Sequence, residues 1–302
     1  MKLSSHDLKD LLALAIEAAR RAGAYVHSRA GKHGEVLTKE GGSSRASQIV
    51  TGVDFESQRL ILDTLDESIV SFDLGLLTEE RQDDHSRHEC DYFWCIDPLD
   101  GTLPFVENVV GYSVSIALVS RDGEPMLGVI QDPAAGVLYH AMSGSGAFRD
   151  NEPLVPRDIS SSLTLVMDRS FQEQQNYSQQ LSAIERLAAE HGLSGVKIIS
   201  QGGAAMNACW VIENAPAVYF KPPKPSPGGG SLWDFAASAC IFHESGAVAA
   251  DAAGQPLQLN RKGSTFMNAD GIVYASSAPL AEAIYAFLHA QRTGSGRWNQ
   301  IL

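Results

Sequence analysis

The sequence is poor in cysteine, in basic charge and in long apolar runs, and each shortage excludes a class of protein. Only four cysteines occur among 302 residues, and no two of them form a Cys-x-x-Cys pair. Because most of them stand in apolar or helical surroundings, we expect reduced thiols and a cytoplasmic protein. No run reaches the roughly 18 to 20 apolar residues of a membrane span, and the first residues lack the apolar core of a signal peptide.

Basic residues are outnumbered, because 23 lysines and arginines stand against 36 acidic residues and leave a formal net charge of −13. A protein that binds nucleic-acid polymers irrespective of sequence needs a basic surface, so we exclude that class. A small anionic substrate stays possible, since a bound metal ion can supply the local positive charge.

Several catalytic signatures are also missing. The chain has no Gly-x-Ser-x-Gly nucleophile elbow. His243-Glu244 lacks the second histidine of a zinc protease motif. The glycine-rich stretch 143–148 lies among predicted strands rather than before a helix, so it predicts no dinucleotide site.

The hydrophobic pattern changes along the chain. Apolar residues at helical spacing predict a long first helix beginning near residue 7 and a second helix over 54–67, with a loop over 31–49 between them. Short apolar runs and Asp-Gly turns after residue 112 predict an antiparallel meander, and alternating strands and helices follow from about residue 155. We therefore expect an N-terminal α+β subdomain over 1–155 and a C-terminal α/β subdomain over 156–302.

The most informative segment is Asp97-Pro98-Leu99-Asp100-Gly101-Thr102, which follows an apolar run that predicts a buried strand. Such a turn can present two carboxylates, a backbone carbonyl and a hydroxyl together, which are the ligands that Mg²⁺ prefers. An ordinary Asp-Pro turn explains the same residues equally well, because Asp, Pro and Gly are common turn formers.

Two further acidic motifs bear on this choice. Asp234 stands in Leu-Trp-Asp-Phe-Ala-Ala after a Pro/Gly loop, where an aspartate can also serve merely as a helix cap. Glu79 and Glu80 end an apolar run, although adjacent glutamates are usually solvated.

Taken in order, Leu-Thr-Glu-Glu, Asp-Pro-Leu-Asp-Gly-Thr and Trp-Asp-Phe-Ala-Ala resemble the motifs of the inositol monophosphatase superfamily. Val50-Thr51 with Asp54 is similar to a fourth motif of that family, and the likeness covers about residues 50 to 275. The resemblance implies a layered α-β-α-β-α sandwich, a Mg²⁺-dependent phosphatase, sensitivity to lithium and a homodimer.

The resemblance also implies roles for individual residues, with two or three Mg²⁺ ions as cofactors. Metal ligands would be Glu79, Asp97, the Leu99 carbonyl, Asp100 and Asp234. Catalytic residues would be Glu79 and Thr102, which would orient the attacking water, together with Asp54 at a third, weaker metal site. Substrate contacts would be Asp100, Gly101, Thr102, Lys221 and Asp234, and Lys39 is similar to a basic residue of the family's mobile loop.

The substrate is the open question at this point. Inositol-processing members carry an acidic residue where this chain has Lys221, and bisphosphate nucleotidases carry a basic one nearby. The run Ser264–Asn268 is similar to a C-terminal motif of the nucleotidase branch. We therefore place 3′(2′),5′-bisphosphate nucleotides ahead of inositol 1-phosphate or another sugar phosphate, with a solvated Lys221 as the simpler explanation.

A catalytically silent metal-binding module is the alternative of another class. Such a module would have little need of both Glu79 and Thr102, and both are present.

Overall fold

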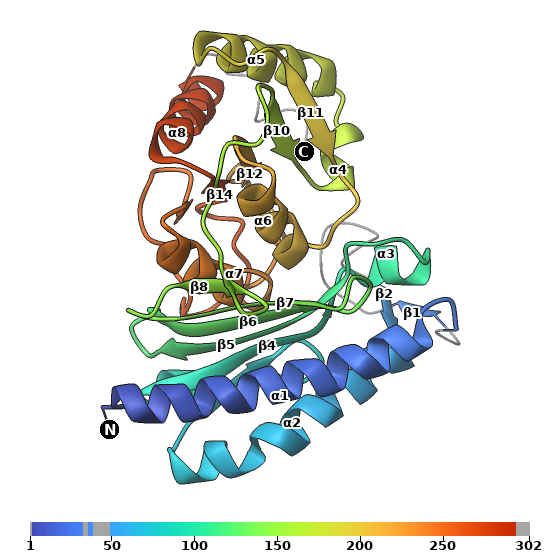
Figure 1. Ribbon diagram of the computed structural model, residues 1–302, viewed down its shortest axis with the longest axis vertical. Coiled ribbons are helices and arrows are strands. Elements are labelled where there is room, and N and C mark those ends of the chain that lie inside the picture. Colours follow the sequence, from blue (N-terminus) through green and yellow to red (C-terminus); the bar gives the residue numbers. More distant parts are fainter. Residues whose placement is uncertain (1, 33–35, 39–48, 294–302) are drawn as a thin grey trace.

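The computed structural model describes residues 2–32, 36–38 and 49–293 and is built on two large β-sheets separated and flanked by helices (Figure 1). The larger sheet has seven strands in sequence order. They are β3 (Gly75–Thr78), β4 (Tyr92–Asp100), β5 (Ser113–Ser120), β6 (Pro125–Asp132), β7 (Val137–Met142), β8 (Ala147–Arg149) and β9 (Glu152–Pro153). Only β3 and β4 are parallel in this sheet, and the remainder forms the antiparallel meander that the sequence predicts.

The smaller sheet has five strands in the order β11-β10-β12-β14-β13. Their bounds are β10 (Leu163–Val166), β11 (Val196–Ile199), β12 (Ala217–Lys221), β13 (Val248–Ala250) and β14 (Ile272–Ala275). Strand β10 is parallel to both β11 and β12, so the carboxyl ends of these three strands meet at one edge.

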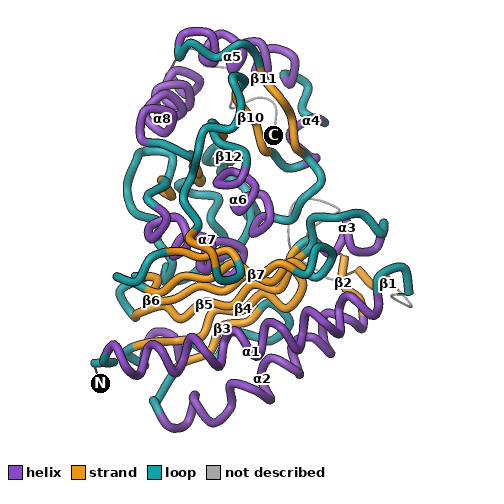
Figure 2. Tube along the Cα trace, viewed as in Figure 1, coloured by secondary structure: helices purple, strands orange, loops and turns teal. Residues whose placement is uncertain are grey.

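Helices complete five layers, which Figure 2 shows as orange sheets between purple helices. The outer face of the larger sheet is covered by α1 (Ser5–Arg29) and α2 (Gly52–Ser71). Between the two sheets lie α6 (Ala204–Glu213) and α7 (Leu232–Ser245). The smaller sheet is covered by α5 (Tyr177–Glu190) and α8 (Ala278–Thr293). The short helices α3 (Thr102–Val106) and α4 (Arg169–Gln172) follow strand ends. The expected α-β-α-β-α sandwich is confirmed.

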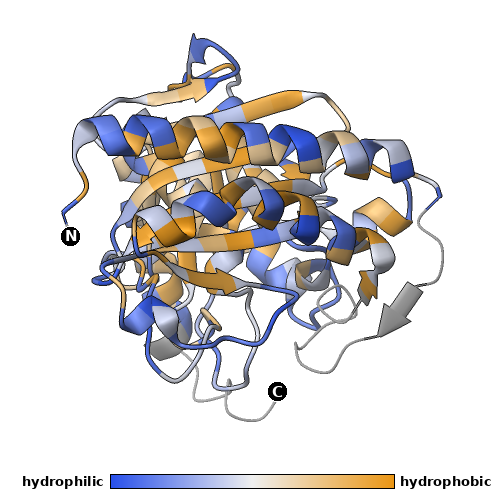
Figure 3. Ribbon diagram, turned by 90° about the horizontal axis from the view of Figure 1, so that it is seen from below, coloured by the Kyte–Doolittle hydropathy of each residue, from blue (hydrophilic) through white to orange (hydrophobic). Residues whose placement is uncertain are grey.

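Three apolar cores match these layers, because each sheet face needs a partner to bury it. One core joins α1 and α2 to the larger sheet, a second lies between the two sheets around α6 and α7, and a third joins α5 and α8 to the smaller sheet. Figure 3 looks at the protein from the side of α1 and α2, and hydrophilic residues recur along their outward surface. None of the helices in the described ranges is long and apolar enough to cross a membrane.

Three helices begin with a capping box in which an aspartate occupies the third helical position. The pairs are Ser4 with Asp7 in α1, Thr51 with Asp54 in α2, and Ser231 with Asp234 in α7. The side chain of the first residue accepts an amide N–H, and the aspartate accepts the N–H of the cap residue in return. This local rule fixes where each helix starts.

Two details differ from the sequence prediction. The second helix spans Gly52–Ser71 rather than 54–67, because its cap is Thr51 and its apolar face continues past Leu65. The prediction of a loop throughout 31–49 is wrong at β1 (Val36–Thr38), which pairs antiparallel with β2 (Ile49–Thr51). Lys39 lies outside the described residues.

Candidate active site

The site begins where β3 and β4 end side by side. Their parallel register pairs Thr78 with Ile96, so the next residues, Glu79 and Asp97, are neighbours at the same sheet edge. The Glu79 amide continues the ladder by donating to the Ile96 carbonyl at 3.2 Å. Two acidic motifs that are far apart in the sequence thus meet through simple strand pairing.

A bulge at the end of β4 turns both aspartates into the site. Asp97 pairs with Ser115 and Asp100 with Ser113, so three steps along β4 oppose two along β5. Pro98 lies in this bulge, where its missing N–H removes no ladder hydrogen bond. Asp97 accepts the Leu99 amide at 3.0 Å, which fixes its carboxylate.

Gly101 makes the turn that follows. Its φ of +80° lies in the left-handed region, and a Cβ there would come within 3.0 Å of the Gly111 carbonyl oxygen. Glycine avoids both the strain and the collision. The turn delivers Thr102 as the first residue of α3.

Asp100 faces the start of α6 across the gap between the sheets. Its two carboxylate oxygens accept the amides of Ala204 and Ala205, at 3.0 and 2.8 Å. A Cβ on Gly203 would approach these oxygens to 2.5 Å, so a glycine is needed there. The helix amides hold this carboxylate in place.

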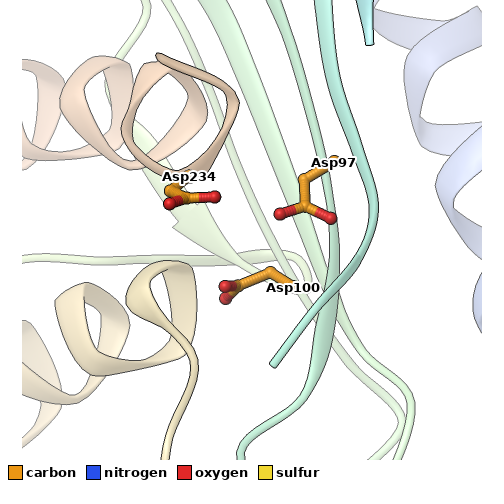
Figure 4. A group of neighbouring side chains, drawn as sticks. All are labelled: Asp97, Asp100 and Asp234. Carbon is orange, nitrogen blue, oxygen red and sulfur yellow. The ribbon is translucent and has the colours of Figure 1, made fainter. Parts of the chain in front are cut away.

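Asp234 is both a helix cap and a member of the site. Its Oδ2 accepts the Ser231 amide at 2.8 Å, which is the capping role that a lone aspartate would have. The same carboxylate points from α7 toward Asp97 and Asp100 (Figure 4). The helix-cap explanation of this residue is confirmed, and a role in metal binding stays a prediction.

Asp97, Asp100 and Asp234 each offer a carboxylate oxygen, and these atoms all lie within 4.8 Å of one another. Burial raises the pKa of each group, to about 8 for Asp100 and well above the ordinary value for Asp97, and neighbouring carboxylates add to the rise at Asp97 and Asp100. Glu79 is one of the charges that act on Asp97. Buried carboxylates that repel one another at this distance fit a hard divalent cation, which takes oxygen ligands and removes the repulsion.

A second polar group joins α2 to the Gly101 turn. The Thr102 hydroxyl lies 3.1 Å from Asp54 Oδ1 and 3.2 Å from the Leu99 carbonyl oxygen, so its hydrogen is directed to these acceptors. The other oxygen of Asp54 accepts the amide and the hydroxyl of Thr51, at 2.8 and 2.6 Å. Burial raises the pKa of Asp54 to about 6 even though these hydrogen bonds lower it. Asp54 therefore lies beside Thr102 and holds its hydroxyl.

Lys221 ends β12 next to the acidic cluster rather than inside it. Its ammonium forms an ion pair with Asp168 at 2.8 Å and lies 5.3 Å from the ring centre of Phe235. The side chain is 18% exposed.

Asp168 was not expected from the sequence. It follows β10, and the parallel register of Val166 with Tyr219 places it opposite Lys221. A carboxylate directly after an apolar strand, combined with the parallel arrangement of β10 and β12, is the signal that could have identified it.

The comparisons with known proteins agree with this geometry. The family model described as the inositol monophosphatase family matches residues 7–292. The chain belongs to the inositol monophosphatase family. Members of this family are phosphatases, and the protein is a phosphoric monoester hydrolase.

Relatives cover most of the chain. A protein of Thermotoga maritima named fructose-1,6-bisphosphatase/inositol-1-monophosphatase is 30% identical over 266 residues, which are 88% of this chain and 93% of that protein. The Nus factor SuhB of Vibrio cholerae is 29% identical over 282 residues, 88% of this chain and 91% of its own.

Among solved structures, the inositol monophosphatase of Thermotoga maritima superposes with a TM-score of 0.72 at 24% identity and covers 93% of this chain and 99% of its own. That likeness shows the inositol monophosphatase fold.

Proposed function

We propose that the protein is a Mg²⁺-dependent phosphatase whose substrate carries a second anionic group, as a 3′(2′),5′-bisphosphate nucleotide does. The single observation that carries the substrate proposal is the place of Lys221. A half-buried ammonium stands at the edge of an otherwise acidic site, where it can bind an anion that the carboxylates would repel.

The metal ligands in this proposal are the carboxylates already brought together. Asp97, Asp100 and Asp234 would share the ions with Glu79 and the Leu99 carbonyl, while Asp54 serves the weaker third site. When bound, Mg²⁺ neutralises the phosphate dianion and lowers the pKa of a water molecule. This accounts for a phosphatase site without a basic catalytic cluster.

Thr102 and Asp54 supply the orientation of the nucleophile. Because the Thr102 hydrogen is directed to Asp54 and Leu99, the hydroxyl oxygen keeps its lone pairs to accept a hydrogen bond from a water molecule. Glu79 would hold the same water from the end of the neighbouring strand β3. A water held in one orientation reacts faster than a freely diffusing one.

The loop after β12 supports the choice of substrate. Lys224 lies close enough to Lys221 for the two charges to interact, and this repulsion together with burial lowers the pKa of Lys224. The run Ser264–Asn268 packs against the same loop, because Met267 donates its amide to the Gly230 carbonyl at 2.9 Å. Lys221 and the run Ser264–Asn268, the two sequence features that favour a bisphosphate substrate, therefore adjoin the same loop.

Inositol 1-phosphate is the second candidate, and the names of several relatives favour it, such as the inositol monophosphatase 1 of Sus scrofa at 27% identity. The test compares kcat/KM for 3′-phosphoadenosine 5′-phosphate and for inositol 1-phosphate at saturating Mg²⁺. We expect a preference for the bisphosphate that Lys221→Met abolishes. A preference for inositol 1-phosphate rejects our ordering.

Glu79→Gln tests the catalytic proposal against a silent metal-binding module. We expect the variant to lose Mg²⁺-dependent phosphate release while it keeps its fold. Glu80→Gln, one residue along, is the matched control and should keep most of the turnover. Equal turnover in wild type and Glu79→Gln contradicts the proposed role. Homodimer formation and inhibition by lithium belong to the same proposal.

A further inference from the structure

Lys221 lies between two sets of carboxylates. On one side is Asp168, with which it pairs at 2.8 Å. On the other side is α7, where the Phe235 ring under the ammonium is the residue next to Asp234. Burial lowers the pKa of Lys221, but Asp168, Asp234 and Asp100 together raise it above its ordinary value, so all three act on the ammonium.

Asp168 is held firmly by its own partners. Its Oδ1 accepts the Tyr219 hydroxyl at 2.8 Å and the Asn207 amide at 3.2 Å. These donors come from β12 and α6, and they leave Oδ2 for Lys221. The ammonium is thus fixed to the smaller sheet rather than left to rotate on its flexible stem.

We propose that Asp168 is a positioning residue that keeps the Lys221 ammonium beside, and not among, the carboxylates that bind the metal. Without this partner the nearest anionic groups for Lys221 are Asp234 and Asp100. A lysine that pairs with those carboxylates acts as an internal cation and competes with Mg²⁺. The proposal rests on the proposed metal site and adds a residue that protects it.

The test measures Mn²⁺ binding to the EDTA-treated protein by isothermal titration calorimetry, independently of any substrate. We expect Asp168→Asn to weaken Mn²⁺ binding by about tenfold, or ~1.4 kcal/mol. Lys221→Met should bind Mn²⁺ at least as tightly as wild type. The double variant Asp168→Asn/Lys221→Met should match Lys221→Met within about twofold, because the competing ammonium is gone.

The double-mutant cycle of Asp168→Asn and Lys221→Met distinguishes a positioning role of Asp168 from a direct effect of its negative charge. If Asp168 acts only through its own negative charge, the weakening persists in full in the Lys221→Met background, and the proposal is wrong. Unchanged affinity in Asp168→Asn also overturns it. Asp251→Asn is the matched control, since that carboxylate accepts the amides of Ala253 and Gln255 in a turn after β13.

Tyr219→Phe repeats the test without a change of charge, and it replaces Asp168→Asn in the cycle if that variant does not fold. It removes one of the two donors that hold Asp168, so we expect a smaller weakening that also disappears with Lys221→Met. Failure of wild type to bind Mn²⁺ would contradict the metal site itself, which distinguishes the two proposals.

Discussion

Replacing Thr51 with valine removes a hydrogen bond that favours the ionised form of Asp54. The Thr51 hydroxyl lies 2.6 Å from Asp54 Oδ2. Asp54 is 1% exposed, so water cannot replace the lost donor. Burial already raises the pKa of Asp54 to about 6, and the hydrogen bond from Thr51 works against that rise. The substitution must therefore raise the pKa further.

The size of the effect follows from the hydrogen bond. A bond to a buried carboxylate contributes about 2 kcal/mol, which corresponds to roughly 1.5 pH units. If Thr102 needs an ionised Asp54 to hold its hydrogen, activity falls as the pH drops through the pKa of Asp54. The acid limb of kcat should then move upward by roughly 1.5 pH units in Thr51→Val relative to wild type.

The assay is the pH dependence of kcat for phosphate release at saturating Mg²⁺. Thr51→Ser is the matched control, because it keeps the hydroxyl and should keep the wild-type acid limb. Ser4→Ala removes the equivalent cap of α1 and should lower the free energy of unfolding by about 1 kcal/mol without moving the limb. An acid limb that stays in place or moves to lower pH in Thr51→Val refutes the reasoning.

Three further predictions concern stability and the metal. Burial raises the pKa of Asp54, Asp97 and Asp100. Between about pH 4 and 6 these groups therefore bind more protons in the folded state than in the unfolded state. As a result, the free energy of unfolding of the metal-free protein falls as the pH rises. Differential scanning fluorimetry with EDTA should show that fall, and added Mg²⁺ should stabilise more at pH 8 than at pH 5.5; a metal-free Tm that rises across this range argues against it. Asp97→Asn should raise the metal-free Tm by a few degrees, because one repelling carboxylate is gone, and should abolish the Mg²⁺-dependent rise seen in the same assay. Gly101→Ala should cost about 1–2 kcal/mol in urea unfolding through left-handed strain and reduce kcat, since the turn carries Thr102; full activity would show that this turn tolerates a Cβ.

Many elements of this fold can be predicted from short stretches of the sequence. The 3.6-residue spacing in α1, the capping boxes at Thr51 and Ser231, and the Asp-Gly and other glycine turns of the meander each depend on a few consecutive residues. Such features are readable because their hydrogen bonds and buried faces are formed within one element. The order of the acidic motifs also identified the family.

What the sequence left open was decided by packing. The residues around Asp97 left an even choice between a simple turn and a metal site. The structure shows a cluster of carboxylates there, because the parallel register of β3 and β4 brings Glu79 alongside Asp97 and α7 brings Asp234 close to it. Asp234 itself shows the limit, since its capping role is local and its place beside Asp97 and Asp100 needs a helix from another layer. No spacing along the chain encodes these approaches.

Lys221 is a second residue whose surroundings could not be predicted from the sequence. The sequence determined that a lysine stands at the end of strand β12 and that the chain carries the acidic motifs of a phosphatase. Only the tertiary structure gave that lysine a partner, because Asp168 meets it through the parallel pairing of β10 and β12 and lies 53 positions away in the sequence. Charges separated along the chain interact only once the sheet fixes their distance, and that distance decides what the charge can do.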